Sequence, residues 1–142
     1  MISIGIIGLG YWGNNIHKTL TDTEYENIIT CDSNIAIADL ADYTQIGCVS
    51  HVFIATPAST HYPICKHFLE RGVNVFCEKP LSLSLEACNT LYLIAEENRC
   101  NLFVDWIYTF NAVIRSIKSF ILNSNKTPKN IIINSWGTSR KR

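Results

Sequence analysis

The sequence contains no run of about 18 consecutive apolar residues, the length that a helix needs to cross a membrane. It also lacks a basic leader followed by an apolar segment and a cleavage site, because Met1 leads directly into a strand-like run. These absences argue against a membrane partner and against a secretion signal. We therefore expect a cytoplasmic protein.

Charge of one sign is not in excess either. Lys plus Arg and Asp plus Glu each number 12, so the chain has no overall field with which to attract nucleic acid. Charged residues make up 17% of the sequence and hydrophobic residues 47%. This composition argues against disorder and suits a parallel sheet that is buried on both faces.

Paired cysteines are missing as well. The six cysteines form no C-x-x-C motif and no cluster with the four histidines. In a reducing compartment such scattered cysteines are most simply buried free thiols. The sequence therefore predicts neither a metal site nor a disulfide.

What the sequence does contain is an apolar run, Ile2–Ile7, that breaks into glycines spaced G-x-G-x-x-G. Gly8 would let the chain leave the strand in a tight turn, and Gly10 carries no Cβ that would block a phosphate. Gly13 would let the following helix pack close to the strand. Backbone N–H groups at the start of that helix could then bind a dinucleotide pyrophosphate. The spacing alone also occurs in ordinary turns, so its context decides between the two interpretations.

A second apolar run, Asn27–Cys31, ends in the acid Asp32. This acid lies about 20 residues beyond the glycines, where a carboxylate can accept hydrogen bonds from the adenosine ribose. It would repel the 2′-phosphate of NADP, and no Lys or Arg occurs between Lys18 and Lys66 to attract that phosphate. The pattern therefore favours NAD over NADP. The alternative is that Asp32 caps the next helix.

Short apolar runs alternate with longer helical patterns, the order expected of βαβ units. We expect strands at Ile2–Ile7, Asn27–Cys31, His51–Ala55, Asn74–Cys77 and Leu102–Trp106. Helices are predicted at Trp12–Thr21, Ile35–Asp42, Ser59–Arg71 and Ser84–Asn98, and helical spacing resumes at Phe110–Leu122. The predicted fold is α/β: a doubly wound parallel sheet in three layers, the Rossmann fold.

Residues suited to helix ends support these boundaries. Asn34 is placed to cap the second helix, Ser59 or Thr60 the third, and Ser84 the fourth. Gly72 lies where the end of a helix needs a positive φ.

A polar stretch after residue 122 leads into Ile131–Ile133, a predicted sixth strand. Such a strand would pair with the edge of the main sheet or with a partner chain, which leaves a homo-oligomer open. We assign residues 1–122 to a dinucleotide-binding domain and residues 123–142 to a linker and the remnant of a second domain.

Two polar motifs follow the third and fourth predicted strands: ATPASTH at residues 55–61 and EKP at residues 78–80. Both would lie at the carboxyl edge of the sheet, where open α/β sheets bind ligands. A lysine there could hold a substrate hydroxyl beside a nicotinamide and assist its loss of a proton. Taken singly, the motifs are also explained as a helix N-cap with a surface histidine and as a surface Glu-Lys pair.

Together and in this order, the glycine turn, the acid and the motifs at 55–63 and 78–80 resemble the glucose–fructose oxidoreductase and inositol dehydrogenase family (Gfo/Idh/MocA). The resemblance implies an NAD(P)-dependent oxidoreductase that moves hydride between the cofactor and a secondary alcohol of a sugar-like substrate. The Gly-Tyr-Trp-Gly turn resembles most closely members that act on nucleotide sugars or sugar acids. Lys79 would be the catalytic residue. The cofactor-binding residues implied are Gly8, Gly10, Tyr11, Trp12, Gly13, Asp32, Thr56, Pro57, His61, Glu78, Lys79 and Pro80.

The chain also departs from the family. Residues 104–111 resemble the crossover out of the nucleotide-binding domain, but Trp106 stands where many members have a histidine, so the role of that histidine cannot be transferred. Asp105 either lines the site or is a strand-end acid in solvent. Members continue through a second domain that supplies most substrate contacts, and only its first strand, Ile131–Trp136, has a counterpart here.

These observations leave the function open between two classes. The first is a sugar or nucleotide-sugar dehydrogenase that uses NAD. The second is a non-catalytic NAD-binding module, a truncated remnant without its substrate domain. A third arrangement, in which another polypeptide completes the domain through Ile131–Ile133, would require that strand to pair across an interface.

Overall fold

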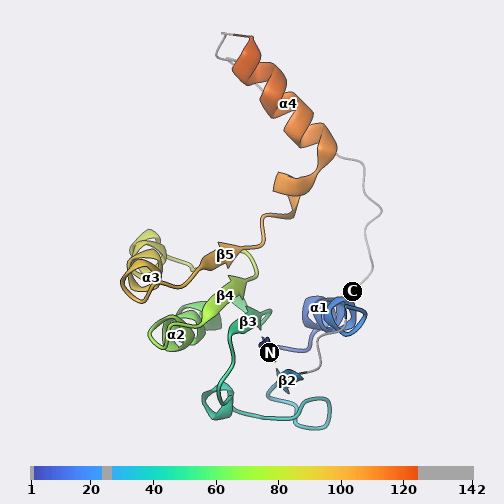
Figure 1. Cartoon of the computed structure of the whole chain (residues 1–142), viewed down its shortest axis with the longest axis vertical. Coiled ribbons are helices and arrows are strands. Elements are labelled where there is room, and N and C mark those ends of the chain that lie inside the picture. The colour runs from blue at the N-terminus through green and yellow to red at the C-terminus, as the bar shows by residue number, and fades with distance from the viewer. Residues whose placement is uncertain (1, 24–26, 125–142) are drawn as a thin grey trace. The chain divides into compact units, whose positions relative to one another are not determined.

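The computed structural model describes residues 2–23 and 27–124. These residues form two compact units, one ending at Asp105 and one beginning at Trp106, and each is described by itself. The first unit contains β1 (Ser3–Ile7), α1 (Tyr11–Thr21), β2 (Asn27–Cys31), η1 (Tyr43–Gln45), β3 (His51–Ile54), α2 (Ala58–Leu69), β4 (Asn74–Cys77), α3 (Leu85–Glu97) and β5 (Leu102–Val104) (Figure 1). The second contains η2 (Ile107–Phe110) and α4 (Ala112–Asn123).

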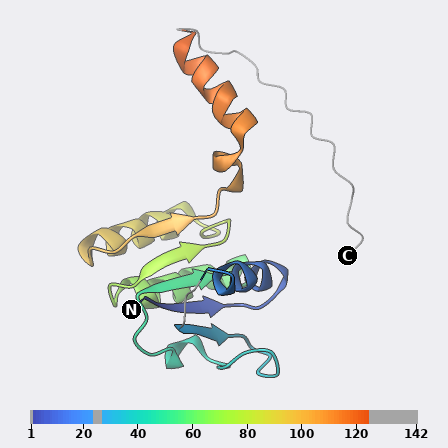
Figure 2. The ribbon, with the colours of Figure 1, turned by 45° about the vertical axis from the view of Figure 1, so that its right-hand side comes forward.

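The strands form one parallel sheet in the order β2-β1-β3-β4-β5. All five arrows point the same way in Figure 2. Ile7 at the end of β1 pairs with Cys31 on one side and Ile54 on the other, and Ile54 pairs in turn with Cys77. The loops that follow these strands therefore leave from the same edge of the sheet. The strand order reverses between β1 and β3, and this reversal is where a doubly wound sheet binds its ligand.

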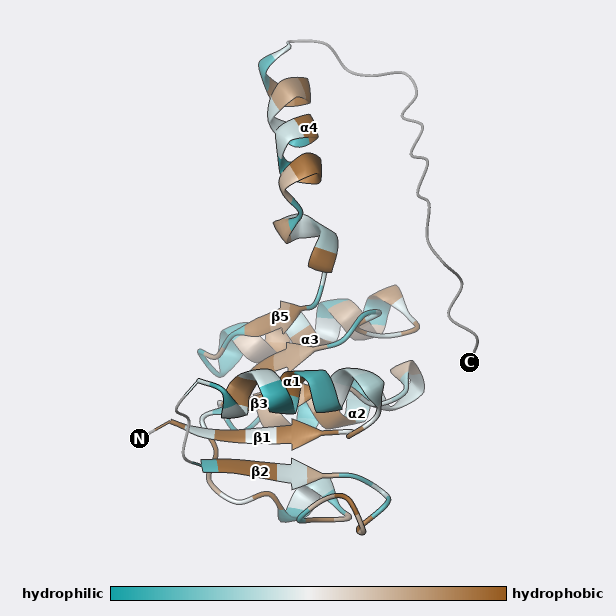
Figure 3. Ribbon diagram, turned by 90° about the vertical axis from the view of Figure 1, so that its right-hand side faces the viewer, coloured by the Kyte–Doolittle hydropathy of each residue, from teal (hydrophilic) through white to brown (hydrophobic). Residues whose placement is uncertain are grey.

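Helices cover both faces of the sheet, which confirms the predicted three-layer Rossmann fold. Ile4 and Ile6 of β1 pack with Ile16 and Leu20 of α1 on one face. On the other face, α2 and α3 cover β3, β4 and β5 (Figure 1). Most of strand β1 is hydrophobic while much of α1 is hydrophilic, as an amphipathic surface helix requires (Figure 3).

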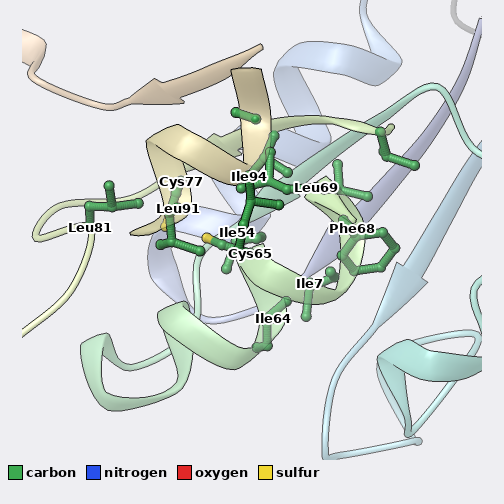
Figure 4. Close-up of a cluster of buried hydrophobic side chains, with 14 of the residues drawn as sticks. Ile7, Ile54, Ile64, Cys65, Phe68, Leu69, Cys77, Leu81, Leu91 and Ile94 are labelled. Carbon is green, nitrogen blue, oxygen red and sulfur yellow. The ribbon is translucent and has the colours of Figure 1, made fainter. Parts of the chain in front are cut away.

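The larger core lies beneath α2 and α3. Cys65, Phe68 and Leu69 of α2 are fully buried and meet Ile54 of β3 and Leu91 of α3 (Figure 4). Each aliphatic or aromatic side chain of this kind stabilises the fold by about 1.5–3 kcal/mol relative to exposure in water. This packing holds β3 and β4, and with them the loops at their carboxyl ends, in a fixed relation.

The predicted helix at Ile35–Asp42 is wrong. The Asp39 carboxylate accepts hydrogen bonds from the Thr30 backbone N–H at 2.8 Å and from the Thr30 hydroxyl at 2.7 Å. Leu40 forms a parallel bridge with Cys31, so this segment runs beside β2 instead of coiling. These hydrogen bonds to β2 outweigh the weak local preference of the segment for a helix. Ile35, the first residue of the predicted helix, is exposed.

The predicted helix ends were partly correct. The Ser84 hydroxyl caps α3 by accepting from the Ala87 N–H at 3.2 Å, and Gly72 has a φ of +71°, as expected. The cap predicted for α2 is wrong, because Pro57 occupies the N-cap position and no side chain caps that end. Ser59 and Thr60 lie inside the first turn, and the Thr60 hydroxyl donates to the Pro57 carbonyl instead.

In the second unit, α4 forms close to the predicted Phe110–Leu122. The Asn111 side chain caps it by accepting from the N–H groups of Val113 and Ile114. The predicted strand at Ile131–Ile133 lies outside the described residues, and the domain division at residue 122 stays a prediction. Across 2–23 and 27–124, no helix is long and apolar enough to span a bilayer.

Candidate functional site

A groove of about 740 Å³ opens at the carboxyl ends of β1, β2 and β3. It brings together five residues that the sequence predicts as cofactor-binding, from three separate loops. They are Gly8, Gly10, Asp32, Thr56 and Pro57. The remaining wall is formed by Ile7, Cys31, Ser33, Ala41, Tyr43, Ala55, Thr60, Pro63 and Ile64.

The three glycines of the turn differ in what their missing side chains permit. Gly8 has a φ of +88°, and a Cβ on Gly13 would lie 1.7 Å from the Gly8 carbonyl oxygen, so the fold itself requires both glycines. A Cβ on Gly10 would meet no atom of the described residues within 4 Å. Since packing does not explain Gly10, its lack of a side chain leaves open space at the start of α1. This is the space that a dinucleotide phosphate needs.

Asp32 lies at the rim of the groove, and backbone groups orient its carboxylate. Oδ2 accepts from the Leu9 N–H at 2.7 Å and Oδ1 from the Asn34 N–H at 2.9 Å. The bond from Asn34, and after it the bond from Leu9, hold the pKa of Asp32 below its ordinary value. The groove therefore carries a negative charge at the end of β2. No helix begins in residues 33–42, the segment directly after Asp32, so the alternative of a helix cap is wrong.

Thr56 and Pro57 form the wall that follows β3. The hydroxyl oxygens of Thr56 and Thr60 lie 2.8 Å apart, which ties the loop to the first turn of α2. His61, the last residue of the motif, does not reach the groove. Its ring is only 1% exposed, and its two nitrogens lie 2.8 Å from the carbonyl oxygens of Thr56 and Pro80.

The EKP motif follows β4 and lies outside the groove lining. Lys79 and Pro80 are exposed and joined by a cis peptide bond, while Glu78 is buried. The Lys79 N–H donates to Glu78 Oε2 at 3.2 Å. The backbone thus turns the lysine side chain outward and the glutamate inward.

Glu78 and Asp105 form an acid pair that the sequence analysis did not identify. Cys77 and Val104 are paired in the sheet, so the residues that follow them lie side by side, and the Asp105 N–H donates to the Cys77 carbonyl at 2.9 Å. Burial, followed by the charge of Asp105, raises the pKa of Glu78. The correct register of β4 and β5 would have predicted this neighbour.

Tyr11 and Trp12 occupy the first turn of α1, where both rings are exposed and pack edge to face at 5.2 Å. Neither ring lines the groove. All six cysteines carry free thiols, and those of Cys65 and Cys77 are fully buried. No group of metal-ligating side chains occurs in residues 2–23 and 27–124.

Comparisons with known proteins agree with this geometry. The sequence profile of the Gfo/Idh/MocA group, described as an oxidoreductase family with an NAD-binding Rossmann fold, matches residues 2–106. A 2,7-anhydro-N-acetylneuraminate hydratase of Mediterraneibacter gnavus is 26% identical, over 84% of this chain and 35% of that protein. An inositol 2-dehydrogenase of Renibacterium salmoninarum is 25% identical, over 84% of this chain and 41% of that protein.

A solved structure shows the same fold. The WlbA dehydrogenase of Bordetella pertussis, in complex with NADH and UDP-GlcNAcA, superposes with a TM-score of 0.75 at 21% identity. The match covers 87% of this chain and 42% of that one. The present chain thus spans between 35% and 42% of the length of these three proteins. Within that span, the open space at Gly10 and the carboxylate of Asp32 fit the phosphates and a ribose of NAD.

Proposed function

The chain belongs to the Gfo/Idh/MocA oxidoreductase family, and we propose that it forms the cofactor-binding part of an enzyme that moves hydride between NAD and a sugar-like secondary alcohol. One observation carries this proposal. The groove joins an unobstructed glycine turn after β1 to an ionised acid after β2, and the loop that bears Lys79 follows β4, two strands from β1 at the same edge of the sheet.

The groove gives the cofactor a direction. The pyrophosphate would lie over Gly10 at the start of α1, and Asp32 would accept hydrogen bonds from the adenosine ribose. The other half of the dinucleotide would then extend past the strand reversal toward Thr56 and Pro57 in the loop after β3. The carboxylate of Asp32 disfavours a 2′-phosphate, so we propose NAD as the cofactor in preference to NADP.

Lys79 is the residue that we assign to proton transfer. When bound, NAD supplies the hydride acceptor or donor. The exposed amine of Lys79 would bind the substrate hydroxyl and take its proton during oxidation, or return a proton during reduction. Glu78, buried beneath it and bonded to the Lys79 N–H, would hold the backbone in place rather than contact substrate.

The relatives support the substrate class. Their names describe enzymes of a sialic acid derivative and of inositol, and the solved dehydrogenase was crystallised with a nucleotide sugar acid. We extend this class to the present chain as a polyhydroxylated, sugar-like substrate. Dependence on NAD and six free thiols suit a cytoplasmic location.

Calorimetric titration of NAD and NADP into the 142-residue chain tests the cofactor assignment. We expect NAD to bind more tightly than NADP. Gly10→Val should abolish binding, because the new side chain fills the phosphate space. Gly47→Val is the matched control, since a Cβ at Gly47 also meets open space but lies outside the groove lining. Equal losses of binding in both variants would contradict the assignment.

A scan of sugars and nucleotide sugars for NADH formation tests catalysis. If the chain turns over a substrate, Lys79→Ala should lower kcat and leave the Kd for NAD nearly unchanged. NAD binding without turnover of any substrate would instead support a binding module, and Lys79→Ala would then change nothing that can be measured.

A further inference from the structure

The interior of the first unit contains a histidine that joins two functional loops. His61 Nε2 lies 2.8 Å from the Thr56 carbonyl oxygen, in the loop that follows β3. His61 Nδ1 lies 2.8 Å from the Pro80 carbonyl oxygen, in the loop that follows β4. The ring therefore spans the space between the groove wall and the residue next to Lys79.

Burial makes these two contacts consequential. His61 is 1% exposed, so water cannot replace a hydrogen bond that its ring fails to make. Each ring nitrogen faces a carbonyl oxygen, and the tautomer decides which of the two carbonyls accepts a hydrogen bond from the ring. The side chain leaves α2 at its first turn, and the packing of α2 against β3 and β4 fixes where the ring lies.

The residues on either side of this bridge have different tasks in the proposed enzyme. Thr56 lines the groove on the side where the nicotinamide half would extend. Lys79, which precedes Pro80, is the proposed proton-transfer residue. A shift of either loop changes the distance between them, and a catalytic group misplaced by about 1 Å can lose a factor of about 100 in rate.

We propose that His61 is a positioning residue that sets the Lys79 loop against the nicotinamide side of the groove. The proposal rests on the function proposed above, and it replaces the direct cofactor contact that the sequence implied for His61. The histidine acts through the carbonyls of Thr56 and Pro80 and touches neither cofactor nor substrate.

Binding of NADH and of ADP-ribose to His61→Leu and His61→Gln tests the proposal. ADP-ribose carries the adenosine, the pyrophosphate and a second ribose but no nicotinamide, so it reports on the glycine turn and Asp32. We expect His61→Leu to weaken NADH about tenfold and ADP-ribose hardly at all. His61→Gln, which retains an amide donor, should lose less. His51→Gln is the matched control, because His51 is exposed at the opposite end of β3.

A merely structural role predicts a different result, namely equal losses for both ligands in step with a lower melting temperature. That result, or unchanged affinity for NADH in a folded His61→Leu, would overturn the proposal. So would equal affinity of the unmodified chain for NADH and ADP-ribose, since the nicotinamide half would then have no binding wall.

Hydrogen exchange of the chain without ligand gives a test that does not depend on NAD. In a folded His61 variant, amides of residues 55–60 and 78–82 should exchange faster, while those of β1 and β2 keep their protection. Unchanged exchange in both loops would overturn the proposal. A chain that binds neither NADH nor ADP-ribose but shows this local loosening would refute the proposed function and retain the bridge.

Discussion

The carboxyl edge of the sheet is built by different means on its β1–β2 side and on its β3–β4 side. On the β1–β2 side, the backbone sets the geometry. The turn tolerates only glycine at Gly8 and Gly13, and backbone N–H groups hold the carboxylate of Asp32. On the β3–β4 side, side chains set the geometry, with Glu78 turned inward and His61 placed between two carbonyls. The comparison teaches that the first side can be recognised from residue spacing, whereas the second depends on how strands and loops pack.

The largest expected effect breaks the β1–β2 side altogether. Gly13→Ala would place a Cβ 1.7 Å from the Gly8 carbonyl oxygen, and neither backbone can move without displacing α1 or β1. We expect a loss of about 3 kcal/mol or more in the free energy of unfolding, measured by urea titration. Gly47→Ala, at an open position, should stay within about 1 kcal/mol of the unmodified chain. Similar losses in both variants would show that α1 does not approach β1 this closely.

A smaller effect, expected for Asp32→Asn, tests how the β1–β2 side contributes to the preference for NAD over NADP. Asp32→Asn keeps the shape of the side chain but removes the charge that repels a 2′-phosphate. We expect the affinity for NAD to fall about tenfold and the ratio of NAD to NADP affinity to narrow, because hydrogen bonds to charged groups are the stronger ones. Calorimetry measures both. Asp22→Asn, at an exposed acid after α1, is the control. An unchanged ratio of NAD to NADP affinity would contradict the assignment of Asp32 to ribose binding.

The smallest effect concerns the β3–β4 side. The pKa of Glu78 is higher in the folded chain than in the unfolded chain. As pH rises through the ordinary pKa of a glutamic acid, the unfolded chain therefore loses the Glu78 proton before the folded chain does. The folded state binds more protons in that window and is destabilised as pH increases. Glu78→Gln should therefore gain stability over the unmodified chain between mildly acidic and neutral pH, by less than about 1 kcal/mol. Urea unfolding across that range measures the difference.

Glu97→Gln, an exposed substitution near the end of α3, controls for a general loss of charge. It should show no pH-dependent gain. A gain for Glu78→Gln that is already complete at acidic pH would contradict the assigned direction of the shift.

Much of the fold could be predicted because its signals are local. Each buried strand is a short apolar run, and Ser84 and Gly72 mark helix ends by chemistry that a neighbouring residue completes. The false helix at Ile35–Asp42 arose because the bond between Asp39 and Thr30 joins residues nine apart, which helical spacing does not reveal. Tertiary hydrogen bonding outweighed a weak local preference there.

The candidate site divides in the same way. The structure places Gly10 and Asp32, both predicted to bind the cofactor, in one groove, because each closely follows a strand, β1 or β2, at the carboxyl edge of the sheet. The surroundings of His61 could not be predicted, since the Pro80 carbonyl comes from a different loop. Asp105 was left undecided because only the register of β4 and β5 brings it beside Glu78.

The carboxylate of Asp32 already holds the Leu9 N–H of the glycine turn and the Asn34 N–H of the following loop. The turn is therefore already ordered in the folded chain, and a ligand that binds there loses no affinity to the entropy of ordering it. Such a preorganised turn favours fast association, since encounter needs no slow rearrangement of the loop first. The acid that we propose to select NAD thus also orders the turn before the dinucleotide binds.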